Sequence, residues 1–187
     1  MTSIIKVDTI QDTAGNNIIN ENSNTITIGA SGDTTNIVGT LQNNGSAVGG
    51  TNTPAFIAYN SANQSIANTT YTTYQYNTEI LDTDNGFNTS TYTYTVPSSG
   101  RYNIGAAAKK LSSGSTDRLI IRLEKNGSNI FYGESYSKDN ASVMFNTVLN
   151  LSASDALKIS IYQNTGGSVD MEGGSGTNVF YGYKIIE

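Results

Sequence analysis

The sequence predicts an all-β protein, and three features of its composition lead to that prediction. Thr, Tyr, Ile and Val, which favour pleated surfaces, recur along the 187 residues, while Asn and Gly, which favour turns, separate them. Only 13% of the residues are charged, so the polarity comes mainly from Thr, Ser, Asn and Gly. The 12 Tyr and 5 Phe are enough to bury a core, which disordered chains usually cannot do. We therefore expect one medium-sized domain, or one domain with an appendage.

Residues 1–50 form the first predicted region. They contain no aromatic residue and no Pro, but short pieces with Ile and Val recur between Asn- and Gly-rich turns. None of these pieces can bury a core alone, and such chains commonly find a partner in other copies of themselves. We predict an extended, β-rich attachment segment with a short trimeric shaft. A flexible low-complexity arm is the alternative, but the regular recurrence of Ile and Val favours the shaft.

The second predicted region covers residues 54–187 and follows a hinge signal at Val48–Pro54, where two Gly precede Thr, Asn and the first Pro. About nine short strands separated by turn signals predict a sandwich or a barrel. No segment shows a helical period over three turns. The strand-like runs are AFIAYN, TYTTYQYNTEIL, STYTYTV, GRYNIGAAAK, RLIIRLEKN, NIFYGESYS, SVMFNTVLNL, ALKISIYQN and NVFYGYKII.

The stretch STYTYTVPSSGRYNI, Ser90–Ile104, predicts a hairpin. Its alternation places Tyr92 and Tyr94 on one face of a strand and the intervening Thr residues on the other. Pro97 lacks an amide donor and therefore belongs at a strand end. Gly100 then closes the turn.

Charge and missing residue types exclude several functions. The net charge is −5 with no basic patch, so we expect no nucleic-acid binding. No run of eighteen apolar residues occurs, so we expect no membrane insertion. The chain has no Cys and no His, which excludes thiolate or imidazole metal sites and a Ser–His triad. We expect no cofactor and no catalytic site; a carboxylate-based glycan enzyme is the alternative.

Acidic and amide side chains gather in predicted loops, and oxygen ligands of this kind can bind calcium. None of these loops has the Asp-x-Asn-x-Asp-Gly spacing, so ordinary turn chemistry is the preferred interpretation. Glu172–Asn178 is rich in Gly but precedes a strand rather than a helix, so we interpret it as a hairpin loop and not as a phosphate loop. The acidic groups are Asp82, Asp84 and Asn85; Asp139 and Asn140; Asp170 and Glu172.

The second region resembles the globular jelly-roll domain of complement component C1q and tumour necrosis factor. Tyr94–Tyr102 is similar to the aromatic-x-x-Pro-x-x-Gly-x-Tyr signature of that family. Ser154 is a departure, because the family usually has Gly before the residue equivalent to Asp155. Further similar stretches are Pro54–Phe56, Tyr74–Asp82, Asp84–Phe87, Leu123–Gly127, Leu149–Ile159 and Phe180–Tyr183.

This resemblance implies a ten-stranded jelly-roll sandwich that associates as a homotrimer. Aromatic residues would then line the core or the threefold interface, and for a single Tyr both locations stay open. Tyr suits an interface because its ring is apolar and its hydroxyl can find a partner. The residues concerned are Tyr74, Tyr76, Tyr92, Tyr94, Tyr102, Phe180, Tyr181 and Tyr183.

The first region has a resemblance of its own. IIKVDTIQDTAGNNII looks like the N-termini of tail-fibre and other virion appendage proteins of marine bacteriophages, notably cyanophages. This implies attachment to other virion proteins. We predict that Ile4, Ile5, Val7 and Ile10 insert between those proteins, since these apolar side chains would otherwise be exposed to water.

Together these features predict a non-enzymatic, homotrimeric virion protein of a tailed bacteriophage. Its knob would contact a glycan or a protein of the host surface as the tip of a tail fibre. A capsid decoration or head-fibre protein is the alternative within the same class. A lectin-like surface-binding module of a bacterium is the alternative from a different class.

Overall fold

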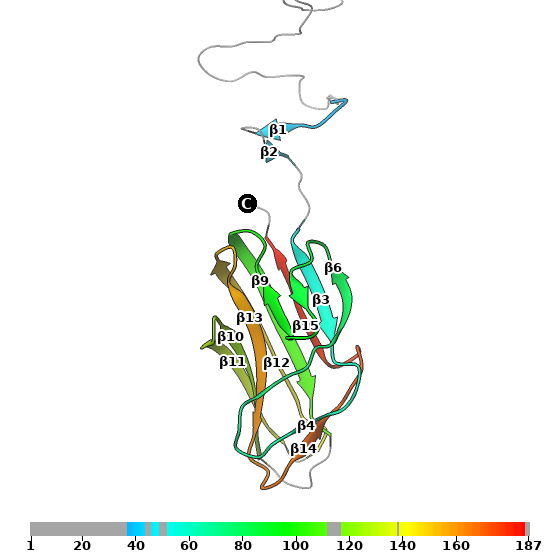
Figure 1. Cartoon of the computed structure of the whole chain (residues 1–187), viewed down its shortest axis with the longest axis vertical. Helices are drawn as coiled ribbons and strands as arrows, with labels where there is room; N and C mark the ends of the chain where they lie inside the picture. Colours follow the sequence, from blue (N-terminus) through cyan, green and yellow to red (C-terminus); the bar gives the residue numbers. More distant parts are fainter. Residues whose placement is uncertain (1–36, 44–45, 49–51, 112–116, 138, 186–187) are drawn as a thin grey trace, which may run out of the picture. The chain divides into compact units, whose positions relative to one another are not determined.

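The computed structural model describes residues 37–43, 46–48, 52–111, 117–137 and 139–185 (Figure 1). The chain divides into two units, Met1–Gly49 and Gly50–Glu187. In the first unit, the described residues form a small antiparallel ladder of β1 (Gln42–Asn43) and β2 (Ser46–Ala47). The predicted attachment residues Ile4, Ile5, Val7 and Ile10 lie outside the described residues, so their role stays a prediction.

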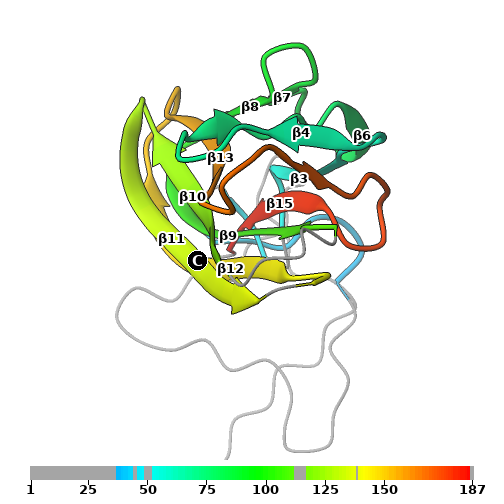
Figure 2. The same cartoon turned by 90° about the horizontal axis from the view of Figure 1, so that it is seen from below.

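The second unit is an all-β sandwich, and its two layers are seen end-on in Figure 2. The β9 sheet has the strand order β12-β9-β15-β3-β6. Its strands are β3 (Ala55–Tyr59), β6 (Thr78–Asp82), β9 (Gly100–Lys109), β12 (Ser142–Leu151) and β15 (Val179–Lys184).

The β13 sheet has the order β11-β10-β13-β8-β7, with β5 also paired to β13. The two sheets contain five and six strands, which confirms the predicted jelly-roll sandwich with one strand, the short β5, in addition to the ten expected. The strands are β5 (Thr72–Thr73), β7 (Phe87–Asn88), β8 (Thr93–Thr95), β10 (Asp117–Lys125), β11 (Ser128–Ser137) and β13 (Ala156–Gln163). A separate antiparallel pair joins β4 (Gln64–Ile66) and β14 (Val169–Met171).

The core lies between the two sheets and is rich in aromatic rings. Phe56 of β3 stacks on Tyr94 of β8 with ring centroids 3.9 Å apart, so this contact joins the two layers. Phe180 of β15 meets Phe56 edge-on at 4.9 Å. All three side chains are buried. Burying a side chain of this size stabilises the fold by roughly 1.5–3 kcal/mol, which explains how a chain so rich in polar residues folds.

The predicted hairpin at Ser90–Ile104 is wrong. β8 pairs with β13 and β7, whereas β9 pairs with β12 and β15, so the chain crosses from one sheet to the other after Pro97. Tyr102 donates a hydrogen bond from its hydroxyl to the carbonyl of Ser98 at 2.6 Å and thereby fixes the crossing. Tyr92 precedes β8 in a turn with a φ of 57°. The alternation of Thr and Tyr indicates a strand but does not indicate which strand pairs with it. Tyr94 pairs with Leu157, which is distant in sequence.

The run TYTTYQYNTEIL is also divided between the sheets. β5 belongs to the β13 sheet and β6 to the β9 sheet, and the chain crosses between them at Tyr74 and Tyr76. Both tyrosines are fully buried, and burial raises the pKa of each hydroxyl. The Tyr76 hydroxyl donates to the carbonyl of Ala107 at 2.9 Å, so it has a partner inside the core.

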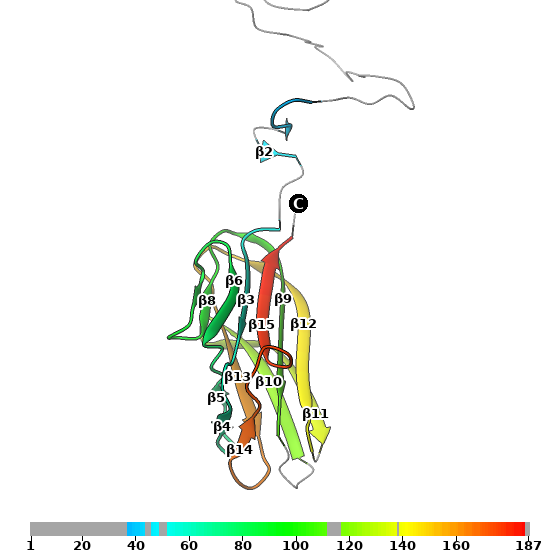
Figure 3. The same ribbon diagram turned by 90° about the vertical axis from the view of Figure 1, so that its right-hand side faces the viewer.

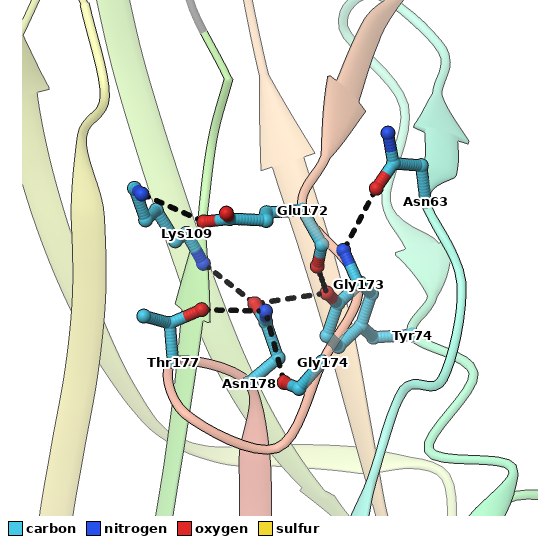
Figure 4. Close-up of polar contacts among 8 residues, drawn as sticks. All are labelled: Asn63, Tyr74, Lys109, Glu172, Gly173, Gly174, Thr177 and Asn178. Carbon is cyan, nitrogen blue, oxygen red and sulfur yellow. Dashed lines mark hydrogen bonds and ion pairs between the residues drawn. The ribbon is translucent and has the colours of Figure 1, made fainter.

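A buried amide, Asn178, fixes the start of β15 (Figure 4). Its Oδ1 accepts a hydrogen bond from the backbone amide of Lys109 at 2.8 Å and one from the Tyr74 hydroxyl at 3.1 Å. Its Nδ2 donates to the Thr177 hydroxyl at 2.8 Å. Glu172–Asn178 is a loop as predicted, but not a hairpin loop, because β14 before it pairs with β4 and β15 after it pairs with β9 and β3.

Candidate interaction face of the β9 sheet

The β9 sheet presents an outward face built by three neighbouring cross-strand rows. In Figure 3 the strands β6, β3, β15, β9 and β12 lie side by side. The register aligns one row of neighbouring residues that contains Val148, Asn103, Tyr183 and Ala55. The central row contains Asn146, Gly105, Tyr181, Ile57 and Leu81. The third row contains Met144, Ala107, Val179, Tyr59 and Thr78.

No charged residue occupies these three rows, all of which lie in the described part of the chain. On β9, the charged residues Arg101 and Lys109 stand at the two ends of the strand. Depletion of charge at the centre of a surface distinguishes the core of a protein–protein interface from ordinary surface.

Several side chains of this face are large, apolar and open to solvent. Met144 is 67% exposed, Val148 54%, Leu81 43% and Tyr183 37%. Exposed apolar residues scattered singly are ordinary, but these four stand on three strands of one surface: Met144 and Val148 on β12, Tyr183 on β15 and Leu81 on β6. A contiguous apolar patch on a folded domain marks an interaction site.

The centre of the face is held in place by hydrogen bonds. Tyr181 lies across Gly105, because a Cβ added at Gly105 would collide with the tyrosine ring. Asn146 donates through Nδ2 to the Tyr181 hydroxyl at 3.0 Å and to Oδ1 of Asn103 at 2.8 Å. Asn103 donates back to Oδ1 of Asn146 at 3.1 Å. A surface fixed in this way loses little side-chain freedom when a partner covers it.

The outward face of the β13 sheet is different in chemistry. Arg118 and Glu134 form an ion pair across β10 and β11, with Nε 2.8 Å from Oε2. Arg122 pairs with Glu124, and its guanidinium lies 3.8 Å from the ring centroid of Tyr71. On the side of β10 away from the core, three of four residues are charged, namely Arg118, Arg122 and Glu124, and the fourth is the buried Ile120.

The structure separates the sequence-predicted aromatic residues into three groups. Tyr181 is half-buried and Tyr183 is exposed, and both belong to the outward face of β15. Tyr92 is half-buried in the turn before β8. The core contains Tyr74, Tyr76, Tyr94, Tyr102 and Phe180.

Sequence reasoning missed the aliphatic part of the face. Ile57, Leu81, Met144 and Val148 were present in strand-like runs but were not distinguished from core residues. In SVMFNTVLNL, apolar residues occupy both sides of the strand, and this lack of alternation was the available signal.

No group of three or more acidic residues that could bind a metal ion occurs among the described residues. The carboxylate of Asp82 serves a turn instead, because it accepts from the backbone amides of Gly86 at 3.1 Å and Phe87 at 2.8 Å. Within the described ranges, no helix has the length and hydropathy needed to cross a membrane.

The chain was compared with known proteins by sequence and by structure. No protein-family model and no curated protein matches it. The globular domain of zebrafish complement 1qA is similar in structure, with a TM-score of 0.53, 20% identity, and coverage of 72% of this chain and 98% of that domain. Eiger TNF from S. frugiperda has a TM-score of 0.55 and 12% identity, with coverage of 71% and 92%. Murine APRIL has a TM-score of 0.53 and 14% identity, with coverage of 70% and 98%. The second unit therefore has the C1q/TNF-like jelly-roll fold.

Proposed function

We propose that this chain is a homotrimeric, non-enzymatic structural protein of a bacteriophage virion, and that its jelly-roll knob contacts the host surface. The observation that carries the self-association is the uncharged outward face of the β9 sheet. If that face stayed in water, Met144 and Val148 would expose apolar surface without compensation. The C1q/TNF-like fold supports a trimer, since the sequence resemblance to that family implies threefold association.

Trimer formation is the part of the proposal that the geometry supports most strongly. In a threefold arrangement each copy presents one such face to the axis, so the apolar rows of three copies cover one another. Closed symmetry covers the face in every copy and does not produce open-ended assembly. The opposite sheets, with their charged faces, then point toward solvent and toward any host molecule.

The virion location is supported by the sequence of the first region. IIKVDTIQDT resembles the N-termini of phage tail-fibre and appendage proteins, and Ile4, Ile5, Val7 and Ile10 are the proposed contacts. Deleting residues 2–20 is expected to abolish incorporation into particles while leaving the knob folded. Normal incorporation of that deletion would contradict this attachment role.

The experiment that tests the proposal is labelling of intact virions with an antibody against residues 54–187, viewed by electron microscopy. Label on radiating tail appendages is the expected result for a host-contacting fibre. Label over the head would contradict the tail-fibre assignment and favour a capsid decoration or head-fibre protein. Absence of label from every particle would overturn the virion assignment and favour a bacterial surface-binding module.

A further inference from the structure

The outward face of the β13 sheet contains a pocket next to a cluster of aromatic and charged side chains. The pocket has a volume of about 230 Å³ and is lined by Thr93, Glu124, Asn126, Gly127, Ala156 and Lys158. These residues come from β8, β10, β13 and the turn after β10. Lys158 is directly opposite both Glu124 and Thr93 in the register, so three strands meet at the pocket.

The pocket is preformed, because its polar walls are already held by the fold. Asn126 donates through Nδ2 to Asp155 at 2.8 Å and accepts the backbone amide of Ala156 through Oδ1 at 2.8 Å. The Glu124 carboxylate accepts from the Ser160 hydroxyl at 2.7 Å and pairs with Arg122. Binding sites of this kind lose little entropy when a ligand enters.

The charged side chains at the pocket, Arg122, Glu124 and Lys158, carry one more positive than negative charge. Arg122 neutralises Glu124, whereas Lys158 forms no ion pair with any residue in the described ranges. The whole chain carries a net charge of −5, so a positive pocket is a local exception. A ligand group with a negative charge complements it, and this complementarity gives specificity as well as attraction.

An aromatic platform continues from the pocket along β13. Tyr71 is 40% exposed, and its ring lies 5.1 Å from that of Tyr162, centroid to centroid. Arg122 covers one side of Tyr71 and donates through Nε to Ser160 at 3.1 Å, which links the platform to the pocket. From Lys158 to Tyr162 the strand rises by about 13 Å, four residues at about 3.3 Å each.

We propose that this face binds an acidic saccharide whose carboxylate pairs with Lys158 in the pocket and whose next sugar rings lie along Arg122 toward Tyr71. A few polar groups at fixed positions beside the exposed Tyr71 and the half-buried Tyr162 suit a ligand with many hydroxyls and apolar ring faces. The length of about 13 Å requires more than one sugar ring. This inference deepens the proposed host contact and rests on it.

The test is calorimetric titration of the full chain with oligosaccharides of hyaluronan, alginate, polygalacturonate and polysialic acid, with neutral dextran oligomers and inorganic phosphate as controls. At least one acidic oligosaccharide should bind, more weakly at high salt because the pair is at the surface. Lys158→Ala should weaken that binding by about tenfold or more, since a charge-assisted contact is lost. Lys184→Ala, which removes the same charge from the other sheet, should leave it unchanged.

Chain-length dependence tests the platform separately. Tyr71→Ala should weaken binding of the oligosaccharide severalfold and leave binding of the matching monosaccharide unchanged, whereas Tyr71→Phe should retain most of the affinity. Tyr136→Ala, which removes a 64% exposed tyrosine on β11, is the matched control. Equal loss of monosaccharide and oligosaccharide binding in Tyr71→Ala would contradict the extended site.

Two outcomes would overturn the saccharide assignment: no binding by any of the four acidic probes, or binding of inorganic phosphate as tight as that of the best saccharide. These results would leave the trimer and the virion location untouched, because solution mass and virion labelling measure those directly. Conversely, saccharide binding by a chain that is absent from virions would support the binding site and contradict the phage role.

Discussion

The two sheets of this sandwich share one core but present opposite outward faces. On the β13 sheet, Arg118, Arg122 and Glu124 alternate with buried residues along β10, so the face toward water is charged. On the β9 sheet, the three central rows carry no charge and include exposed Met144 and Val148. An antiparallel sheet with one face in water normally shows polar residues on that face.

This difference shows that burial within one chain does not account for the whole sequence. Along β10, the β13 sheet has charged residues on the side toward water, as folding of a single chain requires, and the large side chains exposed beside them include Tyr71, Tyr132 and Tyr136. The β9 sheet has an additional set of apolar residues that gain nothing from the monomer core. We interpret the second set as a requirement of association.

A charge placed on the uncharged face of the β9 sheet should have a strong effect on association. Ile57→Asp places a carboxylate in the central row, and a trimer would bring three of them together without a cation. A buried, unpaired charge of this kind costs roughly 3–5 kcal/mol. We expect the variant to be a folded monomer by light scattering and circular dichroism.

The control for Ile57→Asp is Tyr136→Asp, on the outward face of β11. It should remain a trimer, because solvent surrounds that position in the proposed arrangement. Equal behaviour of the two variants would contradict the assignment of different environments to the two faces.

The two sides of β15 should respond differently to truncation. Phe180→Ala should lower the free energy of unfolding by about 3–5 kcal/mol, because Phe180 is fully buried between the sheets. Tyr181→Ala should lower it less in the isolated monomer and should mainly weaken association. Urea denaturation at high and low protein concentration separates the two effects, since only association depends on concentration. A Tyr181→Ala effect that is independent of concentration would place Tyr181 in the monomer core.

Asn178 connects the interior to the uncharged face, because it fixes the start of the strand that carries Val179, Tyr181 and Tyr183. Asn178→Leu leaves the amide of Lys109 and the Tyr74 hydroxyl without this acceptor. We expect a loss of about 1–3 kcal/mol in the free energy of unfolding, measured by thermal denaturation. Thr177→Val, which removes only an outer partner of Asn178, should cost less; a larger loss would contradict the central role of Asn178.

The smallest expected effect concerns Asp155, at the edge of the charged face. The hydrogen bond from the backbone amide of Ser152, followed by that from the Asn126 side chain, holds the pKa of Asp155 below its ordinary value. A lowered folded-state pKa gives stability that is present above the ordinary pKa and is lost as pH falls through the folded value. The stability difference between wild type and Asp155→Asn in urea should therefore be present at pH 7 and shrink below about pH 4. A difference that is the same at pH 7 and pH 3 would contradict this.

Much of the fold could be predicted from the sequence, because strand residues and turn residues differ in type. The jelly roll followed from the Pro97, Gly100 and Tyr102 signature and from the closing strand, and its turn at Ser154 forms with a φ of 72° although that residue is not Gly. What could not be predicted was which strands pair. Tyr94 and Leu157, or Phe56 and Asp82, are partners only because the chain crosses repeatedly between two layers.

The candidate site was harder to predict than the fold, for a physical reason. A residue such as Val148 is equally suited to a core and to an interface, and only the register shows that it points away from Ile104 and the other core residues. The polar pocket at Lys158 is formed by three strands and a turn, so no single stretch of sequence contains its signature.

Thiol labelling measures whether other copies of the chain cover the outward face of the β9 sheet. Because the chain has no Cys, Val148→Cys and Tyr136→Cys each introduce a single thiol, at positions 54% and 64% exposed in one chain. In the native full chain, maleimide should label the cysteine at 148 at least about tenfold more slowly than the one at 136, and at the same rate once the chain is unfolded. Equal labelling rates in the native protein would contradict the claim.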